Sequence, residues 1–252
     1  MRAGISMREL DPKSPHALPA CSVLGAGRLG TVLAAALSDA PALRRGEPVP
    51  ETAEVVLLCV PDGKIAEVAA SLPEGPLLGH CSGATGLDVF GTREGFSLHP
   101  LMSVPTGSEP SVLRGAGAAI DGTTERALNV AATLAGELGM LATRVAAEDR
   151  AAYHAAGAIA ANFLVALEAC AERLAATTGI TRTQLAPLVL ATAEQWARLG
   201  PEAALTGPIA RGDEGTVERH RAVIAERTPE LLPVWTELAE VTRAVAGRRS
   251  WT

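Results

Sequence analysis

Residues 21–37, CSVLGAGRLGTVLAAAL, lead from a short apolar run through Gly25, Gly27 and Gly30 into an alanine-rich segment. A strand, a glycine-rich turn and a helix in this order form the unit that cradles the phosphates of a dinucleotide. The glycines let the backbone approach a pyrophosphate at the N-terminus of the helix. We therefore predict a cofactor-binding turn, and the alternative is a turn that only packs a helix closely on a strand.

The segment after this unit is too short for the second strand and the return helix that bind the adenosine part of a dinucleotide in such a fold. Only the 17 residues SDAPALRRGEPVPETAE separate Leu37 from Val55, and they contain several prolines and no alternating β-branched run. Proline removes strand hydrogen bonds, so we expect a second strand that is shortened or missing. Arg44 and Arg45 lie about 20 residues past the first glycine, where a ribose-reading group is expected. They contact a 2′-phosphate or are solvated surface arginines.

The first half of the chain alternates short apolar runs with helical patterns. This alternation predicts an α/β fold with a mostly parallel sheet and helices on both faces. We expect strands at 22–24, 55–60, 77–80, 96–98, 118–120 and 141–145, and helices at 31–38, 65–71 and 123–138. Ligands bind at the carboxyl edge of such a sheet. The expected cofactor-binding residues are Gly25, Ala26, Gly27, Arg28, Leu29, Gly30, Val60, Pro61, Asp62 and Ser82.

The pattern becomes entirely helical from Glu148 onward. Residues 149–178 form one long helical pattern, and Pro187 is expected to bend a later helix or to delay its start. The later helices are expected at 183–199, 213–226 and 229–246. We therefore predict a flexible tail at residues 1–19, a nucleotide-binding domain at 20–147 and a helical substrate-binding and dimerisation domain at 148–252.

Charge and composition narrow the classes of function. The formal net charge of −6 at pH 7 comes without a basic block, which argues against nucleic acid as a partner. Uninterrupted apolar runs such as VVLLCV fall far below the roughly 20 residues of a bilayer-spanning helix, so we expect no membrane segment. The N-terminus lacks the apolar region of a signal peptide, which favours a cytoplasmic protein.

The cysteines Cys21, Cys59, Cys81 and Cys170 are far apart and form no C-x-x-C pair. We therefore expect neither a zinc site nor a disulfide framework, but buried free thiols. Cys81 lies in the loop GHCSG, which should open toward the cleft, and there a reactive role competes with a packing role.

Two histidines and an asparagine are candidate catalytic residues. His99 ends a predicted strand in FSLHPL, where an imidazole can act as acid or base or bind a carboxylate; the alternative is a histidine that satisfies loop carbonyls. His154, Ala158 and Asn162 recur every four residues on the long helix and so share one face. Polar groups on so apolar a helix need hydrogen-bond partners, which a substrate or neighbouring helices can supply.

Residues 205–220, LTGPIARGDEGTVERH, form the most specific polar motif. Asp213 is placed to cap the following helix, which is a complete structural explanation of that residue. Capping does not explain Thr206, Arg211 and His220 around the same helix start. A helix N-terminus preceded by an arginine favours binding of an anion. We therefore predict that Thr206, Arg211, Asp213 and His220 bind substrate.

Six motifs together resemble a family of oxidoreductases, from about Cys21 to Ala246. They are GAGRLG, VVLLCVPD, HCSGATGLDVF, FSLHPLMS, EDRAAYHAAGAIAANFLVAL and ALTGPIARGDEGTVERH. That family pairs a Rossmann-like domain with a helical C-terminal domain of unknown function. It is similar to pyrroline-5-carboxylate reductase, ketopantoate reductase and the 6-phosphogluconate dehydrogenase-like enzymes. The resemblance implies NAD(P) as cofactor, a C-terminal domain of the 6-phosphogluconate dehydrogenase-like type and a homodimer formed through that domain.

The chain departs from the family pattern at two places. The region between Leu37 and Val55 is shorter, and Ala158 replaces a lysine that several relatives place four residues before an asparagine. Our leading hypothesis is an NAD(P)-dependent oxidoreductase that transfers a hydride to or from a small anionic substrate: a carboxylate-bearing ketone, imine or hydroxy acid. NADP is favoured over NAD, with weak binding. The alternative is a dinucleotide or metabolite sensor or a scaffold, descended from such an enzyme, with a degraded cofactor site.

Overall fold

The computed structural model describes residues 19–37 and 40–247. The predicted tail at 1–19 therefore lies, except for Pro19, outside the described residues. The chain divides into two compact units, Met1–Ile159 and Ala160–Thr252. The division falls inside the long helix that the sequence predicts.

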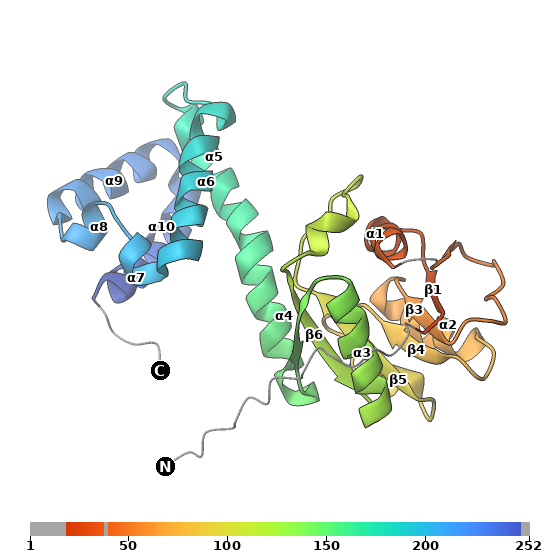
Figure 1. The fold of residues 1–252 in the computed structure, drawn as a ribbon. Helices are drawn as coiled ribbons and strands as arrows, with labels where there is room; N and C mark the ends of the chain where they lie inside the picture. Colours follow the sequence, from red (N-terminus) through yellow and green to blue (C-terminus); the bar gives the residue numbers. More distant parts are fainter. Residues whose placement is uncertain (1–18, 38–39, 248–252) are drawn as a thin grey trace, which may run out of the picture. The chain divides into compact units, whose positions relative to one another are not determined.

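The first unit is built on a seven-stranded sheet with the strand order β2-β1-β3-β4-β5-β6-β7 (Figure 1). Every neighbouring pair is parallel except β5 and β6, so the predicted mostly parallel α/β sheet is confirmed. The strands are β1 (Cys21–Leu24), β2 (Ala42–Leu43), β3 (Val55–Leu58), β4 (Leu77–His80), β5 (Gly95–Pro100), β6 (Gly117–Gly122) and β7 (Leu141–Arg144).

Helices cover both faces of this sheet. Alternation along β3 explains why, because Val55 and Leu57 enter one hydrophobic cluster while Val56 and Leu58 enter the other. The first cluster also takes residues of α1 (Arg28–Ala36) and α3 (Glu125–Glu137), and the second takes residues of α2 (Ile65–Ser71).

The second strand is shortened, as the sequence predicts. β2 has only two residues, and these pair with Val23 and Leu24 of β1. Residues 44–54 then reach β3 without a helix, and Val49 and Ala53 of this segment pack against the second cluster. The chain thus leaves β1 for β2 on one side and returns to β3 on the other, which opens a crevice at the carboxyl ends of β1 and β3.

The long helix begins with a short 3₁₀ turn (Ala147–Asp149) and α4 (Arg150–Ala158), continues through a π-helical turn (Ile159–Phe163) and ends as α5 (Leu164–Ala176). A π turn holds more residues than an α turn. The four-residue spacing from His154 to Asn162 therefore does not by itself place the two side chains on one face. The sequence pattern gave no sign of this turn.

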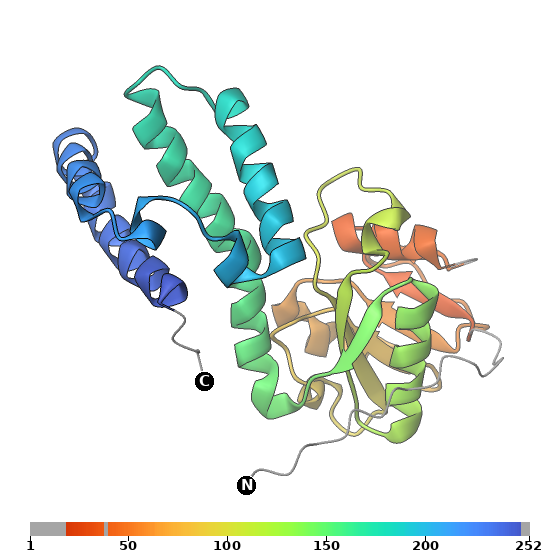
Figure 2. The same cartoon turned by 60° about the vertical axis from the view of Figure 1, so that its left-hand side comes forward.

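The described residues of the second unit form helices joined by turns, without a strand. Figure 2 shows α5 and α6 as separate helices joined by a short loop. α6 begins at Arg182, so Pro187 lies inside it and does not delay its start. The helices after α5 are α6 (Arg182–Leu199), α7 (Pro201–Ala204), α8 (Pro208–Arg211), α9 (Glu214–Arg227) and α10 (Leu232–Ala246), with a 3₁₀ turn at Pro229–Leu231.

The segment Ala147–Ala176 is long and apolar enough, by length and composition alone, to cross a membrane. This is a matter of average hydropathy and does not overturn the expectation of no membrane segment, which is based on uninterrupted apolar runs. The first turns of the segment are fixed to the sheet by side-chain hydrogen bonds of Arg150 and Tyr153.

Candidate cofactor and active site

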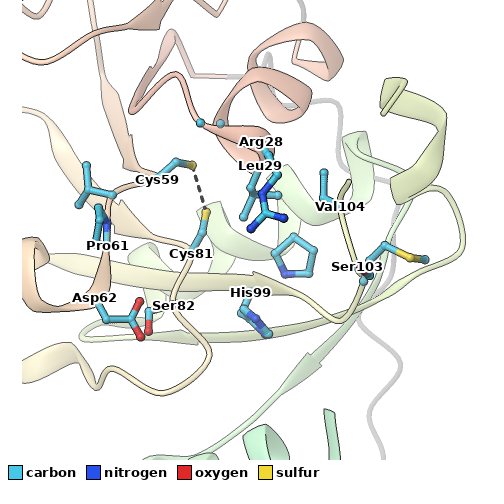
Figure 3. A pocket seen from close by; sticks show the side chains of 15 residues that line it. Arg28, Leu29, Cys59, Pro61, Asp62, Cys81, Ser82, His99, Ser103 and Val104 are labelled. Atoms are coloured by element: carbon cyan, nitrogen blue, oxygen red, sulfur yellow. Dashed lines mark hydrogen bonds between the residues drawn. The ribbon is translucent and has the colours of Figure 1, made fainter. Parts of the chain in front are cut away.

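A cavity of about 550 Å³ lies at the carboxyl ends of β1, β3, β4 and β5 (Figure 3). Most of the residues predicted at the cofactor site line it, and so does His99. The predicted residues in its wall are Gly27, Arg28, Leu29, Gly30, Val60, Pro61, Asp62, Ser82 and His99. The wall also contains Cys81, whose loop the sequence places at the cleft. Sequence reasoning did not assign the other lining residues to it: Cys59, Pro100, Met102, Ser103 and Val104.

The glycines of the turn have different tasks. Gly25 has φ +118°, and a Cβ there would lie 2.3 Å from the carbonyl oxygen of Cys59. A Cβ on Gly30 would lie 1.8 Å from the carbonyl oxygen of Gly25. Gly25 therefore lets the turn pack against Cys59 at the end of β3, and Gly30 lets the start of α1 pack against the turn itself. A Cβ on Gly27 would meet nothing within 4 Å. Gly25 and the exposed Ala26 are not among the lining residues.

The N-terminus of α1 has the features of an anion site. Gly27 is its N-cap, and among the described residues no side chain caps it. The first intrahelical bond of the turn runs from the N–H of Thr31 to the carbonyl of Gly27 at 2.9 Å. The N–H groups that precede Thr31 can thus receive a phosphate, which the helix dipole also favours. The residues present fit the pyrophosphate of a dinucleotide.

The residue after β2 is an arginine. The carbonyl of Leu43 accepts a hydrogen bond from Gly25 N–H at 2.9 Å, so Arg44, the next residue, lies beside the glycine turn. Enzymes specific for NAD place a carboxylate at this position to bind the ribose hydroxyls. Arg44 and Arg45 are both exposed and bring positive charge there instead.

His99 is held by a tyrosine from the long helix. Its Nδ1 lies 2.8 Å from Tyr153 Oη, which also lies 3.3 Å from the carbonyl oxygen of His99. The pKa of His99 is lowered to about 4, first by burial and then by the charges of His154 and Arg150. His99 is therefore a neutral imidazole at pH 7. Sequence reasoning missed Tyr153 because no local pattern reveals that α4 packs on β5.

His154 and His99 lie near each other. Their ring centroids are 6.3 Å apart, and a Cβ on Gly83 would come within 2.9 Å of His154 and 2.8 Å of His99. Gly83 therefore makes room for both rings above the loop that follows β4. The first unit thus brings two of the three predicted catalytic residues together with Ser82.

Arg150 fixes α4 to the sheet. The side chain is 5% exposed; its Nη2 donates to Ser97 Oγ at 2.7 Å and its Nη1 to the Ser82 carbonyl at 3.3 Å. Among the described residues its Nε has no hydrogen-bond partner. Burial lowers the pKa of this guanidinium, but the side chain of arginine stays charged at neutral pH.

His80 is a structural histidine that shapes the same loop. Its Nδ1 accepts from Ser82 N–H at 3.2 Å, so Nε2 carries the proton that it donates to the Gly86 carbonyl at 3.2 Å. Burial lowers the pKa of His80 to about 4, which keeps this arrangement neutral. The sequence placed His80 in a strand and gave it no role.

The remaining predicted site residues belong to the second unit. Asn162 lies in the π turn, and Thr206, Arg211 and His220 are exposed. Asp213 caps α9 by accepting from Thr216 N–H at 3.0 Å and from Thr216 Oγ1 at 2.7 Å. These hydrogen bonds are the first cause of the lowered pKa of Asp213. The N-terminus of α9 is thus already occupied by a carboxylate of its own chain.

The mostly parallel sheet, whose strand order reverses next to β1, and the helical C-terminal region define a Rossmann-like fold. The chain belongs to the family described as "Domain of unknown function (DUF2520)", whose model matches residues 117–242. A comparison with curated proteins finds no match.

Solved structures carry the same fold. Protein TM1727 from Thermotoga maritima is 26% identical with a TM-score of 0.77, over 90% of this chain and 98% of that one. The "putative NADP oxidoreductase BF3122" from Bacteroides fragilis is 20% identical with a TM-score of 0.74, over 89% and 98%. Pyrroline-5-carboxylate reductase from Streptococcus pyogenes is 13% identical with a TM-score of 0.58, over 90% and 98%.

Proposed function

We propose that the protein is an NAD(P)-dependent oxidoreductase acting on a small carboxylate-bearing ketone, imine or hydroxy acid. One observation carries the proposal: the cavity combines the helix N-terminus at Gly27, which no described side chain caps, with a neutral histidine, His99, at the neighbouring strand ends. The first feature suits a dinucleotide phosphate, and the second suits proton transfer to a substrate beside it. The names of structural neighbours, such as NADP oxidoreductase and pyrroline-5-carboxylate reductase, support this class.

The cofactor would be held by the turn after β1 and the ends of β3 and β4. In this proposal Gly27, Arg28 and Leu29 bind the pyrophosphate, while Pro61 and Asp62 border the nicotinamide ribose. Bound NAD(P)H would supply the hydride. NADP is the favoured form because Arg44 stands where a carboxylate would otherwise bind the ribose.

His99 would exchange the proton that accompanies the hydride. With Nδ1 bonded to Tyr153 Oη, Nε2 is the ring nitrogen left for a substrate. When Nε2–H gives its proton to a carbonyl oxygen or imine nitrogen, Nδ1 can take the phenolic proton of Tyr153, so the imidazole ends neutral. The nearby cation of Arg150 favours the charged form of Tyr153, although burial raises the pKa of Tyr153 overall. His154 and Asn162 remain proposed participants, and Arg211 the proposed carboxylate partner.

The test is a titration with NADPH and NADH by calorimetry, followed by a metabolite screen that monitors thermal shift and oxidation of the reduced nicotinamide. Saturable binding together with turnover of a small keto or imino acid supports the enzyme. Binding without turnover of any metabolite would favour the alternative, a dinucleotide sensor, which the two-residue β2 makes a specific candidate. If neither NADPH nor NADH binds at millimolar concentration, both the enzyme and the dinucleotide sensor are rejected, and a scaffold role is left.

We further propose a cytoplasmic homodimer formed through the helical unit. None of the described residues of α5 or α6 is buried, which is unusual for helices that carry large apolar side chains. The apolar residues exposed on this unit and its π turn include Phe163, Leu164, Val165, Leu167, Leu188, Leu190 and Trp196. A second copy of the same unit would cover them.

A further inference from the structure

Two thiols that the proposed chemistry does not use lie side by side in the cavity wall (Figure 3). Cys59 follows β3 directly and Cys81 follows β4 directly, and the last residues of these strands, Leu58 and His80, are register partners. The two cysteines therefore occupy the next positions of adjacent parallel strands. Their Sγ atoms are 3.7 Å apart.

We propose that Cys59 and Cys81 are a modification site that forms a reversible disulfide, and that this disulfide weakens binding of the dinucleotide in the same cavity. The second part rests on the proposed function; the first does not. A disulfide bond is about 2.05 Å long, so the two sulfurs must move toward each other from their present separation. Disulfides in reducing compartments are usually transient ones that sense or transmit redox state.

The two thiols are not equivalent, which sets the order of the reaction. Cys59 is partly exposed, whereas Cys81 is only 8% exposed. The hydrogen bond from Cys59, together with burial, raises the pKa of the Cys81 thiol well above its usual range. Cys59 is therefore the thiol that reacts first with an oxidant entering the cavity, and Cys81 is the one that resolves the product.

The oxidant class is a low-molecular-weight disulfide. The Cys59 thiolate attacks one sulfur of that disulfide, forms a mixed disulfide and releases the first small thiol, which takes the proton that Cys59 has lost. Cys81 then attacks the Sγ of Cys59 and releases the second small thiol, which takes the proton of Cys81. Both protein thiols are oxidised and one small disulfide is reduced to two thiols.

Cys59 couples this chemistry to the nucleotide turn because its backbone supports that turn. Its N–H donates to the Leu24 carbonyl at 2.8 Å, and its carbonyl oxygen leaves no room for a Cβ on Gly25. Its own Cβ would lie 3.1 Å from a Cβ on Gly30. Drawing Cys59 toward Cys81 disturbs this packing. By reciprocity, bound dinucleotide must disfavour the disulfide to the same extent.

The experiment treats the full-length protein with glutathione disulfide, maps disulfides by peptide mass spectrometry and titrates NADPH before and after. We expect one intrachain Cys59–Cys81 disulfide, a loss of NADPH affinity of about tenfold, within the range usual for coupled sites, and recovery with a reductant. Cys21 and Cys170 are internal references. The matched control is the C21S/C170S variant, which should respond fully, whereas C59A and C81A should not respond.

Each result decides a separate part of the proposal. The C21S/C170S variant must first keep the native melting temperature, which shows that it is folded. If Cys59 and Cys81 can still be alkylated after treatment with glutathione disulfide, the proposed modification site is wrong. Formation of the disulfide with unchanged NADPH affinity would overturn the coupling alone. If the reduced protein does not bind NADPH at all, the proposed function fails, and the disulfide map still decides whether the two thiols form the site.

Discussion

The Nδ1 atom of His99, at the end of β5, lies 2.8 Å from Oη of Tyr153 on α4. The two rings meet nearly at a right angle, at 89°, with centroids 5.6 Å apart. This pair, with Arg150 bonded to Ser97 one turn earlier on the same helix, holds a neutral imidazole in the cavity wall. The contact gives the histidine a defined hydrogen-bond partner and makes its protonation state testable.

Replacing Tyr153 by Phe removes the hydroxyl and keeps the ring. We expect a fall in kcat of about 10²-fold, in the lower range of general acid–base effects, with KM nearly unchanged, because the hydroxyl acts on proton transfer rather than on binding. Nitrogen NMR of His99 in the free protein should show a changed tautomer ratio. An unchanged tautomer ratio together with unchanged kcat would contradict the proposed role, and Tyr153 would then only pack α4 on β5.

Stability should fall in mild acid. The pKa of His80 and that of His99 are lowered from 6.5 to about 4, so the unfolded chain binds protons more readily than the fold does. Their contribution is complete above pH 6.5 and is lost as pH falls toward 4. Thermal unfolding between about pH 5 and 6.5, where ordinary carboxylates stay ionised, isolates this effect. His99→Gln should make the decline in Tm shallower; an equal slope would argue against a buried neutral His99.

Gly25 and Gly27 provide a matched pair of substitutions. Gly25→Ala should destabilise the protein by about 2 kcal/mol or more, since φ is +118° and the new Cβ would collide with the Cys59 carbonyl. Gly27→Ala should change stability by less than about 0.5 kcal/mol, because its Cβ meets nothing within 4 Å. The same variant should weaken NADPH binding about tenfold, a loss of roughly 1.4 kcal/mol, by filling the phosphate cradle. Unaltered affinity would place the pyrophosphate elsewhere.

Cofactor preference depends on the residue after β2. Arg44→Asp should weaken binding of NADPH about tenfold, as expected for one charge-assisted contact with phosphate, and leave NADH binding equal or tighter. Calorimetric titration of both cofactors measures the ratio. Tighter binding of NADH than of NADPH by the unmodified protein would overturn the preference.

The helical unit should make the protein a dimer. Light scattering at micromolar concentration is expected to give twice the mass of one chain. Phe163→Glu, at a side chain that is 63% exposed, should shift the equilibrium toward monomer because it buries a charge in the interface. Leu141→Glu is the control, since Leu141 is 67% exposed on β7 of the other unit. A monomeric unmodified protein would refute the dimer.

The short elements of the first unit could be predicted closely. The strand Leu77–His80 and the helix Ile65–Ser71 have the expected bounds, and the shortened second strand appears as β2. Each of these elements is predicted from a signal within the segment itself. The strand follows from a run of apolar residues, the helix from the helical spacing of its apolar residues, and the short β2 from the prolines around it. The π turn at Ile159–Phe163 could not be predicted, because its apolar and small residues fit an ordinary α-helix equally well.

The sequence alone determined the glycine turn, the order of strands and helices and the cap at Asp213, because backbone conformation and hydrogen bonds between near neighbours depend on a few adjacent residues. Only the tertiary structure decided which chemical groups meet. Cys59 with Cys81 and His99 with Tyr153 are 22 and 54 residues apart in the chain. Such pairs depend on the order of strands in the sheet and on where α4 packs, which follow from burial of the whole core rather than from any local pattern.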